Sequence, residues 1–237
     1  MKMVAGKMVY DTIAELVAPK HTALLVIDIQ NDHGAKGFLA RKGRDISWVL
    51  KILPGVKKVI AEARRHGMPV IFTSNTLSKD LKAESPAQLR FLSKSAHLAE
   101  GLTGYELEDS WGNEVLEDLE RRPDEPWIVK YRSSSFHGTR LDFLLKTAKI
   151  ETAIVVGLVT EGCVESTVRD LVGYGYYPVL LRDCVTSSRK DLHDAALLVM
   201  DARYDVITSE ELFKGLPSLD ADKVSRAEPA TDNVKSS

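Results

Sequence analysis

The chain has 237 residues, 44% hydrophobic and 28% charged, and its 32 basic and 34 acidic side chains leave a net charge of −2. This length and apolar content predict a large buried core, and the balanced charge argues against nucleic acid or an anionic membrane as the main partner. No apolar run approaches the roughly 20 residues of a membrane span, no secretory signal is evident, and two cysteines do not make a disulfide framework. We therefore expect a cytoplasmic, globular protein.

Apolar runs rich in β-branched residues recur along the chain and predict buried strands, because they are apolar on both faces. They cover residues 23–29, 69–73, 127–130, 153–156, 178–181 and 204–207. Apolar positions at helical spacing lie between them, at residues 56–63 after Pro54-Gly55, at 141–148, at 164–172, and at 195–200 after Asp191. This alternation predicts an α/β fold: a doubly wound, mostly parallel six-stranded sheet with helices on both faces.

Two charged residues stand at the ends of predicted strands. Asp28 directly follows four aliphatic residues, and Lys130 closes the third predicted strand. Taken singly, Asp28 could cap a loop and Lys130 could reach solvent from an edge strand. Parallel strands end at one edge of a sheet, so each residue can supply the counter-charge that the other lacks.

Cys163 lies where a strand passes through a short glycine-containing loop into a helix. On a first helical turn, the positive end of the helix dipole would face the sulfur. A free thiol of pKa ~8.5 is only about 3% ionised at pH 7, and the helix and a nearby ammonium could supply the ~2 kcal/mol needed for half ionisation. The alternative is a buried thiol that only packs, and this is our interpretation of Cys184, which has no helix start behind it.

Three ordered segments resemble motifs of the isochorismatase-like cysteine hydrolases. They are residues 23–31, with an aliphatic-Asp-x-Gln-Asn pattern; Lys130 with Phe136-His137-Gly138-Thr139; and residues 157–164, with Gly-x-x-Thr-x-x-Cys-Val. The similarity runs from about residue 20 to about residue 210. It implies a Rossmann-like fold with a triad of Cys163, Asp28 and Lys130, and an oxyanion site at the backbone N–H groups of Thr160 and Cys163. It also implies a cis peptide between Val159 and Thr160, and assembly as a dimer or tetramer.

With this resemblance, we expect a hydrolase domain over residues 21–216, preceded by an extension at 1–20 and followed by a polar tail at 217–237. Residues 74–110 form a Ser-, Lys- and Glu-rich insertion with one predicted helix, which could cover the pocket.

We expect neither a catalytic metal nor a cofactor. Nicotinamidases of this superfamily carry an Asp-x-His pair and a second His after the second strand, whereas this chain has Thr73-Ser74-Asn75-Thr76-Leu77 there, and the next histidine is His97. The ligand spacing of a catalytic metal is therefore absent.

The helix that follows Cys163 resembles that of the ureidoacrylate-type amidohydrolases, which act on carbamoyl and ureido compounds. Gln30 and Asn75 could hydrogen-bond an amide or ureido head, and Trp111 or Phe136 could form a wall of the pocket, although Trp111 could instead pack under the insertion. Glu161 lies where substrate contacts are expected.

The sequence thus predicts a cysteine-dependent amidohydrolase that cleaves a C–N bond of a small linear substrate through a thioester and releases ammonia or an amine. The alternatives are an isochorismatase-type vinyl-ether hydrolase, which does not need the cysteine, and a non-catalytic binding protein on the same fold. An unrelated nucleotide-binding α/β protein is disfavoured, because no glycine-rich phosphate motif follows any predicted strand.

Overall fold

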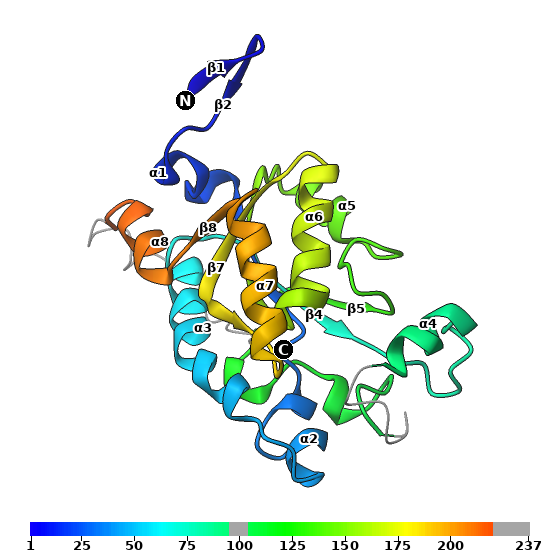
Figure 1. Cartoon of the computed structure of the whole chain (residues 1–237). Coiled ribbons are helices and arrows are strands. Elements are labelled where there is room, and N and C mark those ends of the chain that lie inside the picture. The colour runs from blue at the N-terminus through cyan, green and yellow to red at the C-terminus, as the bar shows by residue number, and fades with distance from the viewer. Residues whose placement is uncertain (95–103, 220–237) are drawn as a thin grey trace, which may run out of the picture.

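In the computed structural model, which describes residues 1–94 and 104–219, six parallel strands form one sheet in the order β5-β4-β3-β6-β7-β8 (Figure 1). The strands are β3 (Thr22–Ile27), β4 (Val70–Asn75), β5 (Trp127–Lys130), β6 (Thr152–Leu158), β7 (Tyr177–Thr186) and β8 (Asp205–Ile207). All six predicted strands are confirmed, and every pairing between them is parallel.

Helices cover both faces of the sheet, as predicted. The helices are α1 (Ile13–Leu16), α2 (Phe38–Arg41), α3 (Ser47–Arg65), α4 (Pro86–Leu92), α5 (Leu141–Thr147), α6 (Glu165–Gly173), α7 (Lys190–Asp201) and α8 (Ser209–Gly215). Residues of α1, α3 and α8 share one buried cluster with Leu24 and Val26 of β3, whereas those of α5, α6 and α7 share the other with Leu25 and Ile27. Successive side chains of a strand point to opposite faces, so β3 contributes to both layers of the core.

Helix α3 begins earlier than the sequence suggested. We expected it to start after Pro54-Gly55, but it begins at Ser47 and Pro54 lies inside it. Asp45 accepts hydrogen bonds from the backbone N–H and the hydroxyl of Ser47, which orders the first turn. The apolar stripe also starts before the proline, with Val49 and Ile52 buried against the sheet. This packing outweighs the hydrogen bond that a proline removes from a helix.

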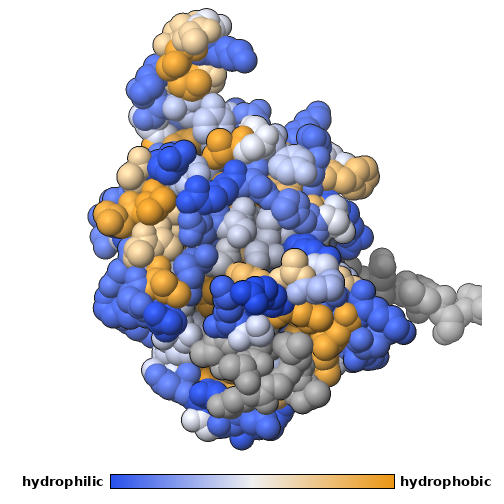
Figure 2. Space-filling view, turned by 45° about the vertical axis from the view of Figure 1, so that its right-hand side comes forward, coloured by the Kyte–Doolittle hydropathy of each residue, from blue (hydrophilic) through white to orange (hydrophobic). Residues whose placement is uncertain are grey.

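Three further segments lie outside the sheet and the helices that cover it: an N-terminal hairpin, the insertion and the tail. Strands β1 (Lys2–Val4) and β2 (Lys7–Val9) pair as a hairpin that projects from the body of the molecule (Figures 1 and 2). The side chains of Met3 and Met8 on this hairpin are exposed. The insertion contains α4 as its helix, while residues 95–103 lie outside the described residues, as does most of the predicted tail, residues 220–237. In the described ranges no helix is both long and apolar enough to cross a bilayer.

The direction in which strands are added to the sheet reverses between the neighbours β3 and β6. From β3 the chain adds β4 and β5 on one side, and from β6 it adds β7 and β8 on the other. In open α/β sheets, ligands bind at the carboxyl ends of the strands at such a point. The two backbones approach closely here: a Cβ on Gly157 would lie 2.0 Å from the carbonyl oxygen of Ile27, and Gly157 has a φ of +126°. Only glycine fits this position.

Candidate active site

The ends of four adjacent strands, β5, β4, β3 and β6, bring the predicted site residues together. Lys130 is the last residue of β5 and pairs in register with Asn75, the last residue of β4. Asp28 directly follows β3, and Cys163 follows β6 in the turn η5 (Thr160–Val164). Lys130 and Asp28 start two strands apart, about 10 Å at the usual strand spacing, and the long lysine side chain spans this gap to reach Asp28.

Asp28 and Lys130 form a buried ion pair, with Lys130 Nζ 2.7 Å from Asp28 Oδ2. The other carboxylate oxygen, Oδ1, accepts a hydrogen bond of 2.7 Å from the hydroxyl of Thr73 in β4. Lys130 Nζ also donates to the carbonyl oxygen of Arg132 at 3.1 Å. The backbone of Asp28 is left-handed, with a φ of +52°, a conformation that Asp tolerates better than most residues. This local geometry turns the carboxylate across the strand ends.

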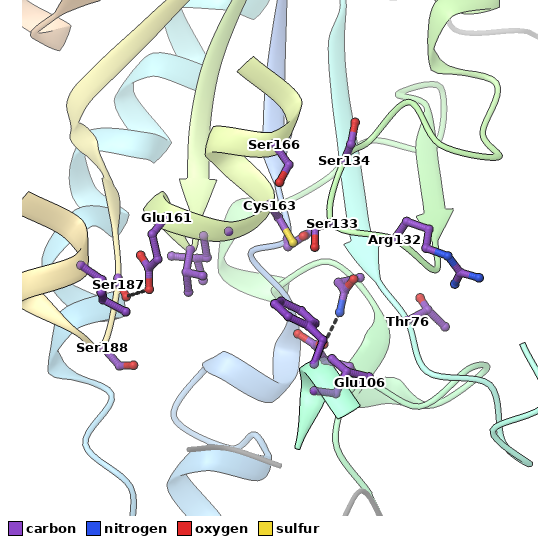
Figure 3. A pocket seen from close by; sticks show the side chains of 18 of the residues that line it. Thr76, Glu106, Arg132, Ser133, Ser134, Glu161, Cys163, Ser166, Ser187 and Ser188 are labelled. Carbon is purple, nitrogen blue, oxygen red and sulfur yellow. Dashed lines mark hydrogen bonds between the residues drawn. The ribbon is translucent and has the colours of Figure 1, made fainter. Parts of the chain in front are cut away.

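Cys163 completes the group. Its thiol lies within electrostatic range of the Lys130 ammonium and the Asp28 carboxylate, and Cys163 and Asp28 line the same pocket. Figure 3 shows its sulfur at the centre of a pocket, at the end of the turn that leads into α6. A thiol, a carboxylate and an ammonium from three separate segments therefore meet at the switch point of the sheet.

The protonation of this group differs from the sequence-based expectation, which was a thiol pKa lowered toward neutrality. Burial raises the pKa of the Cys163 thiol; the Lys130 ammonium lowers it, but Asp28 raises it again, and the net shift is upward. Burial alone would lower the pKa of Lys130, but its interactions with Asp28, first, and with Cys163 raise it well above its ordinary value. The thiol is therefore protonated in this pocket, and a nucleophile here requires proton transfer to a base.

The loop before Cys163 corrects a second expectation. No peptide bond in the described ranges is cis, so the expected cis bond between Val159 and Thr160 is absent. Extended backbone at Val159 (φ −87°, ψ 148°) leads straight into the π-helical turn η5, and the carbonyl of Val159 accepts from Gly162 and Val164. The π-helical turn η5 therefore connects β6 to α6 with trans peptide bonds throughout. Thr160 is fully buried, and its hydroxyl lies 2.8 Å from His193 Nδ1.

The pocket around Cys163 has a volume of about 770 Å³. Of the five side chains expected to bind substrate, Asn75 and Glu161 line it. Glu161 Oε1 accepts a hydrogen bond of 2.7 Å from Ser187, while its buried Oε2 has no hydrogen-bond partner among the described residues. Arg132 also lines the pocket, but its guanidinium points away from Cys163 (Figure 3).

The other three expected substrate contacts lie outside the pocket walls. Gln30 is fully buried, and its side-chain amide donates to the carbonyls of Asn75 and Asn113 and accepts from Asn75 N–H, so it ties loops together. Phe136 is buried in the core and stacks on the exposed ring of Tyr174, with ring centroids 4.6 Å apart. Trp111 is 38% exposed and donates to Glu117. These three side chains therefore pack or hydrogen-bond within the protein, and none of them lines the pocket.

Two residues of the site were not anticipated. Thr73 holds Asp28, and only its place at the end of a predicted strand beside the Asp28 strand hints at this. Glu106, from the insertion, lines the pocket with 7% of its surface exposed; Asn75 Nδ2 donates to its Oε2 at 2.7 Å, and His33 Nε2 lies 3.5 Å from its Oε1. Burial raises the pKa of Glu106 from 4.5 to about 8. No sequence pattern distinguishes it from the solvated glutamates around it.

Among the residues that the structure describes, no group of three or more His, Cys, Asp or Glu side chains is arranged so that it could hold a metal ion.

Comparisons with known proteins place this geometry in a family. The Isochorismatase domain model matches residues 22–211. The chain is 30% identical over 207 residues to the ureidoacrylate amidohydrolase RutB of Caulobacter segnis, covering 84% of this chain and 87% of that protein, and 27% identical over 225 residues to the RutB of Agrobacterium fabrum, covering 90% and 94%.

Solved structures agree on the fold. A cysteine hydrolase from Pseudomonas syringae pv. phaseolicola superposes with a TM-score of 0.71 at 24% identity, over 83% of this chain and 92% of that one. An N-carbamoylsarcosine amidase from Thermoplasma acidophilum does so with a TM-score of 0.62 at 23% identity, over 80% and 96%. The strand order, the switch-point pocket and the family match together lead to one conclusion: the chain belongs to the isochorismatase family.

Proposed function

We propose that the protein is a cysteine-dependent amidohydrolase that cleaves a C–N bond of a small linear amide or ureido substrate. The observation that carries this proposal is that Cys163 and Asp28 line one pocket and that Asp28 forms a buried ion pair with Lys130. A nucleophile beside a base that a third group orients is the arrangement used in covalent catalysis. The RutB relatives, which are named as ureidoacrylate amidohydrolases, support the ureido class.

Asp28 acts as the general base. As Cys163 Sγ bonds to the carbonyl carbon of the substrate, the thiol proton passes to the Asp28 carboxylate and the carbonyl electrons move to oxygen. The backbone N–H groups of Thr160 and Cys163 hold this oxyanion. When the tetrahedral intermediate collapses, the C–N bond breaks, and Asp28 returns the proton to the leaving nitrogen, which departs as ammonia or an amine.

Water completes the cycle. Asp28, again a carboxylate, takes a proton from a water molecule that adds to the thioester carbon. As the C–S bond breaks, Asp28 passes this proton to the sulfur, which regenerates the Cys163 thiol and the Asp28 carboxylate and releases the acid. Lys130 stays charged throughout. Its ammonium keeps the buried carboxylate ionised in its basic form and stabilises the negative charge that moves between sulfur and oxygen.

The test is ammonia release from a panel of ureido acids, carbamoyl compounds and simple amides. We expect turnover by the wild type and by Cys184→Ala, which alters the other cysteine as a control, and a loss of at least roughly 10³-fold in Cys163→Ala. Intact-mass analysis should find an acyl adduct that maps to Cys163. Undiminished turnover in Cys163→Ala, or an adduct on Cys184, would contradict the proposed nucleophile.

The family resemblance also supports assembly in the cytoplasm as a dimer or tetramer. Light scattering of the purified chain tests this part of the proposal, and a monomer at working concentration contradicts it.

A further inference from the structure

Glu106 is a buried carboxyl that lines this pocket and has no task in the proposed mechanism. It comes from the insertion and has left-handed backbone, with a φ of +50°. Its backbone N–H donates to Asp32 Oδ2 at 2.8 Å, and its side chain accepts from Asn75 Nδ2 at 2.7 Å. A non-glycine residue in this conformation, fixed at both its backbone and its side chain, is held in place by its surroundings.

The surroundings of Glu106 are crowded with ionisable groups. Those that face it are Asp28 after β3, Asp32 and His33 in the turn η2 (Asn31–His33), Lys130 at the end of β5, Cys163 in η5, and its neighbour Tyr105. Its charge is felt at the thiol, whose pKa it raises. The carboxyl therefore lies within electrostatic range of the reacting atoms, and Figure 3 shows it on a different side of Cys163 from Glu161.

Substrate chemistry supplies the missing task. An amide or ureido group carries N–H donors beside the carbonyl that the thiol attacks, and a buried donor without an acceptor costs about 1–3 kcal/mol. Asp28 is occupied by Lys130 and Thr73. Gln30 is occupied by backbone groups. Glu106 lines the pocket beside these residues; Asn75 donates to its Oε2, and His33 Nε2 lies 3.5 Å from its Oε1.

We infer that Glu106 is a specificity-determining residue that accepts a hydrogen bond from an N–H of the substrate's amide or ureido nitrogen, with Asn75 fixing its orientation. This inference rests on the proposed function and narrows it to substrates that keep an N–H at the attacked carbonyl. With a pKa of about 8, the carboxyl is mainly protonated at pH 7, so it presents a carbonyl acceptor without adding a negative charge beside the incipient oxyanion. Above pH 8 it ionises, and that charge opposes attack.

The first assay compares each active primary amide or terminal ureide with its N,N-dimethyl analogue. The wild type should prefer the N–H substrate, and the ratio of the two kcat/KM values should fall roughly tenfold or more in Glu106→Ala. Glu106→Gln keeps a carbonyl acceptor, so it should keep most of the preference while losing the alkaline decline near pH 8. Glu106→Met, of similar volume and without an acceptor, replaces Glu106→Ala if that variant does not fold.

The matched control is Glu84→Gln, which alters another buried glutamate of the insertion, one that is hydrogen-bonded to Ser78 outside the pocket lining. It should leave both the preference and the pH profile unchanged. A merely structural role for Glu106 would lower activity on both substrates alike. An unchanged ratio in Glu106→Ala or Glu106→Met overturns the inference.

The second assay needs no turnover. Cys163 is alkylated with iodoacetamide and with N,N-dimethyl-2-iodoacetamide at pH 7, and the ratio of the two rates is compared with that of glutathione. For wild-type Cys163, the rate with iodoacetamide divided by the rate with the dimethyl reagent should exceed the same ratio for glutathione several-fold. In Glu106→Ala this ratio should fall to the value for glutathione. Amide-selective alkylation without hydrolysis of any panel substrate would reject the hydrolase but keep the N–H site. Hydrolysis with a glutathione-like alkylation ratio would reject the N–H site and keep the hydrolase.

Discussion

Lys130 and Asp28 are joined across an intervening strand, and neither side chain of this ion pair is more than 3% exposed. Two charges taken out of water cost several kcal/mol each, and close pairing offsets that cost. The pair is therefore stable only as a unit, and the thiol of Cys163 lies against it.

Lys130→Met should leave a buried carboxylate without its counter-charge and lower the free energy of unfolding by about 3–5 kcal/mol. Because the Lys130 ammonium lowers the pKa of the Cys163 thiol, its loss should raise that pKa and slow alkylation at a fixed pH. Urea denaturation and the pH profile of alkylation measure the two effects. Lys146→Met, which breaks an exposed pair with Asp142, should cost less than about 0.5 kcal/mol. An unchanged alkylation profile in Lys130→Met would place the ammonium elsewhere.

Thr73→Val keeps the shape of the side chain but removes the hydroxyl that donates to Asp28 Oδ1. We expect a stability loss of about 1–3 kcal/mol and a roughly tenfold fall in kcat, because the base loses one of its two fixed contacts. The matched variant is Thr22→Val, which removes another buried hydroxyl from the sheet, one that donates to the carbonyl of Ala18 at 2.9 Å. It should lower stability without lowering kcat. Equal kcat values in the two variants would argue against a positioning role for Thr73.

Gly157→Ala should prevent β3 and β6 from closing at the switch point. The new Cβ would lie 2.0 Å from the carbonyl oxygen of Ile27, in a backbone conformation that L-residues avoid. We expect a loss of more than about 3 kcal/mol, or no folded protein. A Cβ added to Gly173, at the end of α6, would meet no described atom within 4 Å, so Gly173→Ala should be neutral or stabilising by up to about 1 kcal/mol. Thermal unfolding of both variants decides this, and equal melting temperatures would contradict it.

The stability of the protein should depend on pH through Glu106. Its pKa is raised from 4.5 to about 8 in the folded chain, so between these values the folded state binds more protons than the unfolded state. Unfolding free energy should therefore fall as pH rises from about 5 to 8, by at most 4–5 kcal/mol at about 1.4 kcal/mol per pH unit. Glu106→Gln stays neutral and should flatten this slope. Denaturant titrations at several pH values measure it, and parallel slopes for the two proteins would refute the assignment.

The grouping of Asp28, Lys130 and Cys163 could be predicted from the sequence because buried strands are recognisable from their apolar, β-branched composition. Asp28 and Lys130 stood out as charges at the ends of apolar segments, and parallel strands necessarily end at one edge. Cys163 stood out through the strand–loop–helix pattern around it. The expected depressed pKa of Cys163 was wrong, because a helix start is visible in the sequence whereas the degree of burial and the nearby Asp28 charge are not.

Residues in loops were predicted less well. Gln30, Phe136 and Trp111 lie close in sequence to motif positions, yet their side chains pack or brace outside the pocket. Glu106 was missed because its surroundings come from segments far away in the chain. A loop carries no periodic signal that fixes the direction of its side chains.

The sequence by itself determined the parallel sheet, the order of its elements and the three residues at the strand ends, because hydrophobic burial imposes a pattern that can be read locally. Only the tertiary structure decided how deeply the thiol is buried, which side chains face the pocket and that a carboxyl from the insertion faces Cys163. Dielectric environment and side-chain direction depend on every element packed around a group, and no local stretch of sequence contains that information.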